Sequence, residues 1–185
     1  MQTILLILGI NPTNSSKGHY NHGLFNAAIV TLESKYHILT TAVAEDCIIE
    51  KEIDKFKQAD IVIYQYPIYW YMPPAVLKEY IESVFTYNIF FTENNDGDYA
   101  SGGLMNGKKF MLSTTWNSPA KAFENQKAFF SGKTPNDILL PMRKAHIYCG
   151  FKELPHFSCH NIVKKPNFDN DKERYKKHLH NILLS

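Results

Sequence analysis

The stretch from Ala59 to Phe85 constrains the fold more than any other part of the chain, because it joins an apolar strand, an aromatic loop and an amphipathic helix. Residues 61–64 form a β-branched and aromatic run without charge, which is typical of a strand buried on both faces of a parallel sheet. Pro67 ends this strand. The pair Pro73-Pro74 starts a helix, since proline at the first helical position gives up only an N–H that would be unpaired anyway. We therefore predict a strand–loop–helix unit whose loop lies at the carboxyl end of a buried strand.

Strand and helix patterns alternate along the rest of the chain. Apolar runs predict strands at residues 3–10, 36–43, 108–116 and 151–163, and apolar positions at helical spacing predict helices at residues 21–35, 49–58, 137–149 and 175–183. This order predicts one α/β domain over residues 1–185, a three-layer sandwich whose five-stranded parallel sheet of order 2-1-3-4-5 carries helices on both faces. Residues 86–107 show little periodicity, and we expect this long loop to cover a ligand.

Composition excludes several classes of protein. The chain has 185 residues and a formal net charge of +2, which is too small to indicate a nucleic-acid partner. Its first ten residues carry no cationic leader and too short an apolar run to span a bilayer, so we expect no stable membrane insertion and a cytoplasmic location. Cys47, Cys149 and Cys159 include no CxxC pair, and the histidines show no metal-ligand spacing, so no metal site is predicted.

The loop after the first strand has the chemistry of a phosphate site. It leads into a helix start, where unpaired backbone N–H groups and the helix dipole favour an anion. Hydroxyl groups and a lysine add donors to this loop. No GxGxxG or GxxxxGKS motif occurs, so neither a classical dinucleotide fingerprint nor a P-loop is supported. The candidate residues are Ser16, Lys17, Gly18, Tyr20, Asn21 and Gly23.

The loops after the third and fourth strands meet the first loop at one edge of the predicted sheet. Tyr69, Trp70 and Tyr71 follow the third strand, and Trp116 follows the fourth beside polar donors. An aromatic wall next to amide and backbone donors suits an isoalloxazine ring, so the three loops together predict a flavin site. The alternative is that these rings only cap the core. The candidate residues are Pro67, Ile68, Tyr69, Trp70, Thr115, Trp116, Asn117 and Ser118.

Four ordered segments resemble the NAD(P)H:quinone reductases of the modulator of drug activity B type, which are flavodoxin-like FAD enzymes related more distantly to DT-diaphorase. They are QYPIYWYMPPAVLKEYIESVF (65–85), YASGGLMNG (99–107), KKFMLSTTWNSPAKA (108–122) and FFSG (129–132). The resemblance implies FAD bound by the residues named above and by Tyr99. It also implies a homodimer with the site at the subunit interface, and NADPH or NADH as the electron donor. The resemblance favours FAD over FMN, and nothing else in the sequence distinguishes these two cofactors.

The function expected from this resemblance is two-electron, ping-pong reduction of a quinone, with hydride passing from NAD(P)H through flavin N5. Trp116 and Asn117 are the candidates for polarising the flavin. Ile68 departs from the family, which usually has a small residue at this position, and the aromatic pair that follows is Tyr69-Trp70 in this chain. The shape over the flavin ring, and with it the substrate range, is therefore left open. No Tyr–His pair occurs between Gly132 and Leu140, so no proton donor is assigned.

Two rival functions use the same fold. A one-electron flavodoxin-type carrier needs an exposed flavin edge and usually an acidic docking face, which the charge of +2 does not favour. A regulatory flavoprotein subunit of a glutathione-gated potassium efflux system is the other, because some similar flavoproteins are ancillary to such channels. Rapid quinone turnover by the isolated protein separates the enzyme from both.

Overall fold

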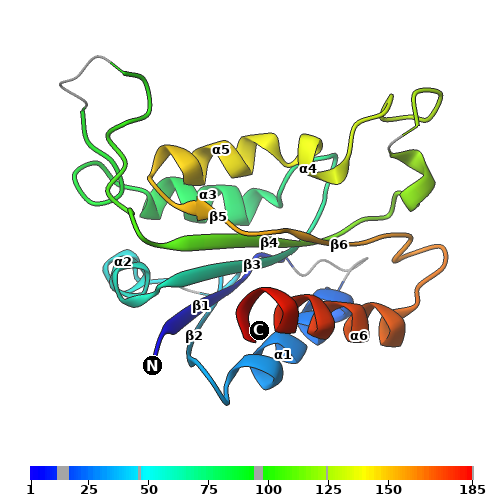
Figure 1. Ribbon diagram of the computed structural model, residues 1–185, viewed down its shortest axis with the longest axis horizontal. Helices are drawn as coiled ribbons and strands as arrows, with labels where there is room; N and C mark the ends of the chain where they lie inside the picture. Colours follow the sequence, from blue (N-terminus) through cyan, green and yellow to red (C-terminus); the bar gives the residue numbers. More distant parts are fainter. Residues whose placement is uncertain (12–16, 46, 94–97, 124, 185) are drawn as a thin grey trace.

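The computed structural model describes residues 1–11, 17–45, 47–93, 98–123 and 125–184, and shows a parallel sheet between two layers of helices (Figure 1). The strands are β1 (Thr3–Leu8), β2 (His37–Ala42), β3 (Ile61–Pro67), β4 (Lys109–Thr115), β5 (Lys152–Glu153) and β6 (Phe157–Cys159). The order β2-β1-β3-β4-β5 confirms the predicted topology. The helices are α1 (His19–Leu32), α2 (Ile49–Gln58), α3 (Ala75–Val84), α4 (Pro135–Ile138), α5 (Leu140–Tyr148) and α6 (Phe168–Leu179), with a 3-10 turn at Ala120–Ala122 and a π-helical turn at His180–Leu184.

The central strands are buried on both faces because successive side chains point to opposite sides of the sheet. In β1, Leu5 and Ile7 pack into the core beneath α2, α3 and α5, whereas Ile4, Leu6 and Leu8 pack into the core beneath α1 and α6. All five side chains are at most 2% exposed. The uncharged apolar run seen in the sequence is therefore the signature of two cores that share one strand.

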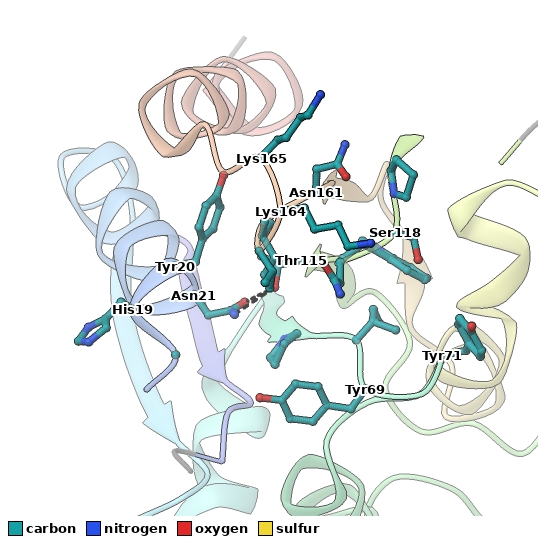
Figure 2. A pocket seen from close by; sticks show the side chains of 18 of the residues that line it. His19, Tyr20, Asn21, Tyr69, Tyr71, Thr115, Ser118, Asn161, Lys164 and Lys165 are labelled. Atoms are coloured by element: carbon teal, nitrogen blue, oxygen red, sulfur yellow. Dashed lines mark hydrogen bonds between the residues drawn. The ribbon is translucent and has the colours of Figure 1, made fainter. Parts of the chain in front are cut away.

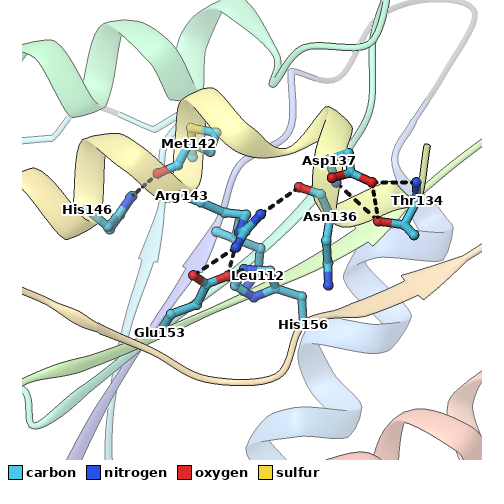
Figure 3. A network of polar contacts seen from close by, with 9 residues as sticks. All are labelled: Leu112, Thr134, Asn136, Asp137, Met142, Arg143, His146, Glu153 and His156. Carbon is cyan, nitrogen blue, oxygen red and sulfur yellow. Dashed lines mark hydrogen bonds and ion pairs between the residues drawn. The ribbon is translucent and has the colours of Figure 1, made fainter.

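The fifth position of the sheet differs from the prediction of one continuous strand. Both β5 and β6 pair with β4, and the chain leaves the ladder between them. Pro155 has no N–H to donate there. The Leu112 N–H of β4 instead donates to Nδ1 of the His156 ring at 3.1 Å, and Glu153 beside it pairs with Arg143 of α5 at 2.5 Å (Figure 3). A side chain thus replaces one backbone acceptor and keeps the buried strand satisfied.

The loop between α3 and β4 lies at the edge of the sheet where the strands begin. Its described parts, residues 86–93 and 98–107, contain isolated bridges, among them Phe91 with Gly103, but no helix or strand. The Met105 N–H donates to the Cys149 carbonyl at 2.8 Å, which ties the loop to the end of α5. The ligand crevice of such a sheet lies at the opposite edge. The described parts of this loop therefore do not cover the crevice of the same chain, and a ligand that they cover would belong to a second copy.

Candidate functional site

A cleft of about 1110 Å³ opens at the carboxyl ends of β1, β3 and β4, where the predicted crevice lies (Figure 2). Ends of parallel strands converge at one edge, so loops far apart in sequence meet there. Most of the sequence-predicted residues line it, and so do several residues that the sequence did not single out. The lining residues are Lys17, Gly18, His19, Tyr20, Asn21, Pro67, Ile68, Tyr69, Trp70, Tyr71, Thr115, Trp116, Asn117, Ser118, Pro119, Lys121, Asn161, Ile162, Val163, Lys164 and Lys165.

The start of α1 forms one wall of the cleft. Gly18 precedes the helix with a φ of 69°, a left-handed conformation that glycine adopts without strain. The first N–H groups of a helix have no partner within it, and Gly18 has no side chain to satisfy them. The buried amide of Asn21 lies one turn into the helix beside Thr115 (Figure 2). This wall therefore offers the donors that an anionic group requires.

Two residues predicted for this wall have other roles in the structure. The Tyr20 hydroxyl donates to Asp171 Oδ2 of α6 at 2.5 Å. The pKa of Tyr20 is raised, mainly because the side chain is partly buried and to a smaller extent because of this hydrogen bond. Gly23 does not line the cleft: a Cβ at Gly23 would lie 2.3 Å from the ring of Phe168, so this glycine permits α1 and α6 to approach. Ser16 lies outside the described residues.

The loop after β3 forms the opposite wall and carries backbone strain. Tyr69 and Met72 exchange backbone hydrogen bonds of 2.9 and 3.0 Å around a tight turn. Trp70 and Tyr71 occupy the turn with φ of 49° and 66°, where a large side chain costs roughly 1–2 kcal/mol. The Trp70 side chain is 86% exposed at the rim, whereas the Tyr71 ring packs against Phe129 and Phe130. Tyr69 extends along the floor of the cleft in Figure 2. Strain of this kind is commonly kept where a ligand is bound.

The loop after β4 contributes amide donors rather than an aromatic wall. The indole of Trp116 is only 1% exposed, packs against Phe123, and donates from Nε1 to Thr114 Oγ1 at 2.8 Å, so it does not form the open ring surface predicted from the sequence. The Trp116 backbone N–H is also used, because it donates to the Cys159 carbonyl at 2.8 Å. Asn117 is exposed and borders the cleft, which makes it the better polarising candidate of the two.

A fourth segment, residues 161–165 after β6, borders the cleft, although it was not predicted from the sequence. Its lysines, Lys164 and Lys165, stand on the rim in Figure 2, and Lys121 lines the same cleft. The signal was present, since the loop after a fifth strand reaches the same sheet edge as the others. With Lys17, the described lining contains four lysines and no carboxylate, so the cleft favours a ligand with several negative charges.

Among the described residues that were predicted to bind the cofactor, Tyr99 lies at the opposite edge of the sheet from the cleft. It belongs to the loop that precedes β4, is 93% exposed, and contacts the Tyr148 ring with centroids 5.8 Å apart.

Among the described residues, no group of three or more His, Cys, Asp or Glu side chains is arranged to hold a metal ion. In the same part of the chain, no helix is long and apolar enough to cross a membrane.

Comparison with known proteins gives consistent results. A family model described as a flavodoxin-like fold matches residues 1–182. The chain is 36% identical over 191 residues to an uncharacterised protein of Schizosaccharomyces pombe, covering 98% of this chain and 97% of that protein. It is 34% identical over 189 residues to the NADPH:quinone oxidoreductase MdaB of Haemophilus influenzae, covering 97% and 98% of the two chains.

The fold is also found among solved structures. A putative quinone reductase from Klebsiella pneumoniae superposes with a TM-score of 0.80 over 97% of this chain and 84% of that chain, at 21% identity. At that identity the likeness concerns the fold alone.

Proposed function

Because this chain belongs to the family with the flavodoxin-like fold and is 34% identical to the NADPH:quinone oxidoreductase MdaB of Haemophilus influenzae, we propose that it is a flavin-dependent NAD(P)H:quinone oxidoreductase. The observation that carries the proposal is the cleft itself. Its walls combine an open helix start, an aromatic turn and four lysines, which together suit a cofactor with a flat ring and a phosphate chain.

The residues fit the flavin in their donor set. The N–H groups at the start of α1, with the Asn21 amide, would hold the phosphate end, because they are donors beside the positive end of the helix dipole. Pro67, Ile68 and Tyr69 would pack against the ring system, since they line the opposite wall. Asn117 and Ser118 would hydrogen-bond the polar edge of the ring.

When bound, the flavin supplies two-electron chemistry, accepting hydride at N5 from NAD(P)H and passing it to a quinone in a ping-pong sequence. The chain's own work is positioning. Pro67 is buried and Ile68 half-buried, so the wall is rigid close to the strand and opens only at the exposed turn. The amide of Asn117 would stabilise negative charge that develops at the ring edge, because a fixed donor requires little reorganisation during the reaction. The same wall would orient the quinone and exclude water from the reacting face.

We propose FAD as the cofactor, and a homodimer as the working form. FAD over FMN rests on the family resemblance. The dimer is supported by Tyr99, which is predicted to bind cofactor yet lies at the strand-start edge of its own chain, so it would reach a cleft only in a second copy.

Exposed apolar side chains supply a surface for that second copy. Most of them belong to α5 and to the loops on the side of the sheet covered by α3 and α5 (Figure 1). Patches of this kind commonly mark protein interfaces. The side chains are Trp70, Tyr71, Met72, Tyr87, Tyr99, Leu104, Phe129, Leu140 and Ile147.

Steady-state turnover with NADPH and menadione, after loading with FAD, tests the proposal. Parallel double-reciprocal plots are expected for a ping-pong enzyme. Asn117→Ala should weaken flavin binding and slow turnover by about tenfold, the cost of one fixed donor. Asn26→Ala is the matched control, because Asn26 is exposed on α1 outside the cleft. An Asn117→Ala protein that binds flavin and turns over like the control would disprove the role of Asn117. A native protein that reduces no quinone would disprove the quinone reductase function, and the carrier and regulatory functions would then be the alternatives.

A further inference from the structure

Four buried polar side chains lie beneath the cleft, and we refer to them as the polar quartet: Asn21, Gln65, Ser113 and Thr115. They come from α1, β3 and β4 and are 2%, 1%, 0% and 1% exposed. The face of β3 and β4 that packs on α1 has buried apolar side chains at Ile61, Ile63 and Met111 and buried polar side chains at the quartet. Burying polar groups is unfavourable unless they are hydrogen-bonded, so a function for these polar side chains is expected.

The hydrogen bonds from Ser113 through Gln65 to Asn21 run in one direction. The Ser113 hydroxyl donates to Gln65 Oε1 at 2.7 Å, and Gln65 Nε2 donates to Asn21 Oδ1 at 2.8 Å. A side-chain amide has an acceptor at one end and donors at the other. In this arrangement Ser113 occupies the acceptor end of Gln65, the donor end of Gln65 faces Asn21, and the Nδ2 end of Asn21 is turned away from Gln65.

The end of Asn21 that is turned away from Gln65 is its donor end. Nδ2 donates to Thr115 Oγ1 at 3.0 Å, the contact drawn in Figure 2, and the Thr115 hydroxyl donates to Asn21 Oδ1 at 3.2 Å. Nδ2 carries two hydrogens, so one bond to Thr115 leaves a second to donate. Asn21 lines the cleft within the first turn of α1. The same helix start presents backbone N–H groups, so the amide adds a donor where the helix dipole already favours an anion.

We infer that Gln65 and Ser113 are positioning residues that hold the Asn21 amide with its N–H group, rather than its carbonyl, toward the phosphate of the bound cofactor. This inference rests on the proposed function, because it needs a phosphate-bearing ligand in the cleft. Neither Gln65 nor Ser113 lines the cleft, so both act through Asn21. A reversed amide would direct a carbonyl oxygen at the phosphate and repel it.

The test compares FMN with riboflavin, which lacks only the phosphate, and includes FAD, which adds AMP to FMN. Dissociation constants of FAD, FMN and riboflavin are measured by fluorescence titration for the native apoprotein, Gln65→Met and Ser113→Ala. Both variants are uncharged and remove the directing bond, so the competent orientation of Asn21 falls toward half of the molecules, and the Kd of FMN and FAD should rise by up to about twofold. Gln65→Glu, which only accepts, should reverse the amide and raise these constants about tenfold to 100-fold. Riboflavin, without a phosphate, should bind every variant as it binds the native protein.

Thr114→Val is the matched structural control. Thr114 is a neighbouring buried hydroxyl on β4 that bonds Ser158 at 3.0 Å and accepts from Trp116 Nε1 at 2.8 Å, and it belongs to no contact of the quartet. Its loss should lower the melting temperature without changing the ratio of FMN to riboflavin affinity. The inference is overturned if Gln65→Met and Ser113→Ala bind FMN as the native protein does, or if they weaken riboflavin and FMN in parallel.

ADP separates this inference from the proposed function, because it carries the pyrophosphate without a flavin ring. If the native protein binds ADP but no flavin, the proposed function is wrong, and weaker ADP binding by the two uncharged variants, with adenosine unaffected, still supports the positioning role. Equal ADP binding by native protein and variants overturns it. A native protein that binds neither flavin nor ADP overturns both.

Discussion

Acidification should unfold this protein through His146, a histidine buried between α5 and the sheet. Its Nδ1 donates to the Met142 carbonyl at 2.8 Å, as Figure 3 shows, and its Nε2 accepts from the Tyr64 hydroxyl at 2.8 Å. The ring stacks on Phe110 with centroids 4.7 Å apart. Burial, which disfavours the charged imidazolium, lowers the pKa of His146 from 6.5 to about 4. The native protein therefore holds this ring neutral at a pH where the unfolded chain protonates it.

The sign and size of the effect follow from that difference. Above pH 6.5 neither state binds the proton, so the full stability is present. As the pH falls from 6.5 toward 4 only the unfolded state binds it, and the free energy of unfolding drops by about 1.4 kcal/mol per pH unit. The total loss attributable to His146 reaches about 3 kcal/mol near pH 4, a large share of the stability of an ordinary domain.

Urea unfolding of the native protein and of His146→Gln measures this loss. Glutamine can bond both partners but does not titrate. His156, whose pKa burial also lowers to about 4, and all other titrating groups are common to the two proteins. The difference in unfolding free energy should therefore shrink by about 2 kcal/mol between pH 6.5 and pH 5. A difference that stays constant over this range would refute the reasoning.

Two further predictions concern the loop before β4 and the lysine rim. Gly103→Ala should lower the free energy of unfolding by about 1–3 kcal/mol in urea titrations, because a Cβ at Gly103 would lie 2.4 Å from the Gly150 backbone nitrogen. The control Ser101→Ala, at an exposed position of the same loop, should change the free energy of unfolding by less than about 0.5 kcal/mol. Lys164→Ala should weaken NADPH binding about twofold to fivefold in low-salt titrations, and this effect should disappear near 1 M salt, since exposed charges are screened. A salt-independent loss would contradict the electrostatic explanation.

The fold was predictable from the sequence because the strands that define it are buried on both faces. The uncharged run at residues 61–64 and the apolar start of the chain are both typical of strands buried on both faces, and both are buried strands in the structure. The predicted strand order 2-1-3-4-5 is confirmed. The split at the fifth position was missed. A histidine ring that substitutes for a backbone acceptor, as His156 does for Leu112, has no periodic signature.

The site was predictable as a set of loops but not as a set of side-chain directions. The sheet-edge rule brings the loops after β1, β3 and β4 together, as the cleft shows. It does not say which way a ring points, so Trp116, which is buried, was read as a wall, and Gly23, which packs on Phe168, as a phosphate ligand. Whether a side chain faces the cleft or the core depends on neighbours that are distant in sequence, such as Phe123 for Trp116.

An anaerobic absorbance experiment tests the central claim most directly. The purified protein, loaded with FAD, is mixed with NADPH and then with menadione while the flavin band is followed. The account predicts that NADPH bleaches the band and that menadione restores it rapidly, which resolves the two half-reactions. A protein that takes up neither FAD nor FMN, or a flavin band that NADPH leaves unchanged, would contradict the account and leave the cleft without the role proposed for it.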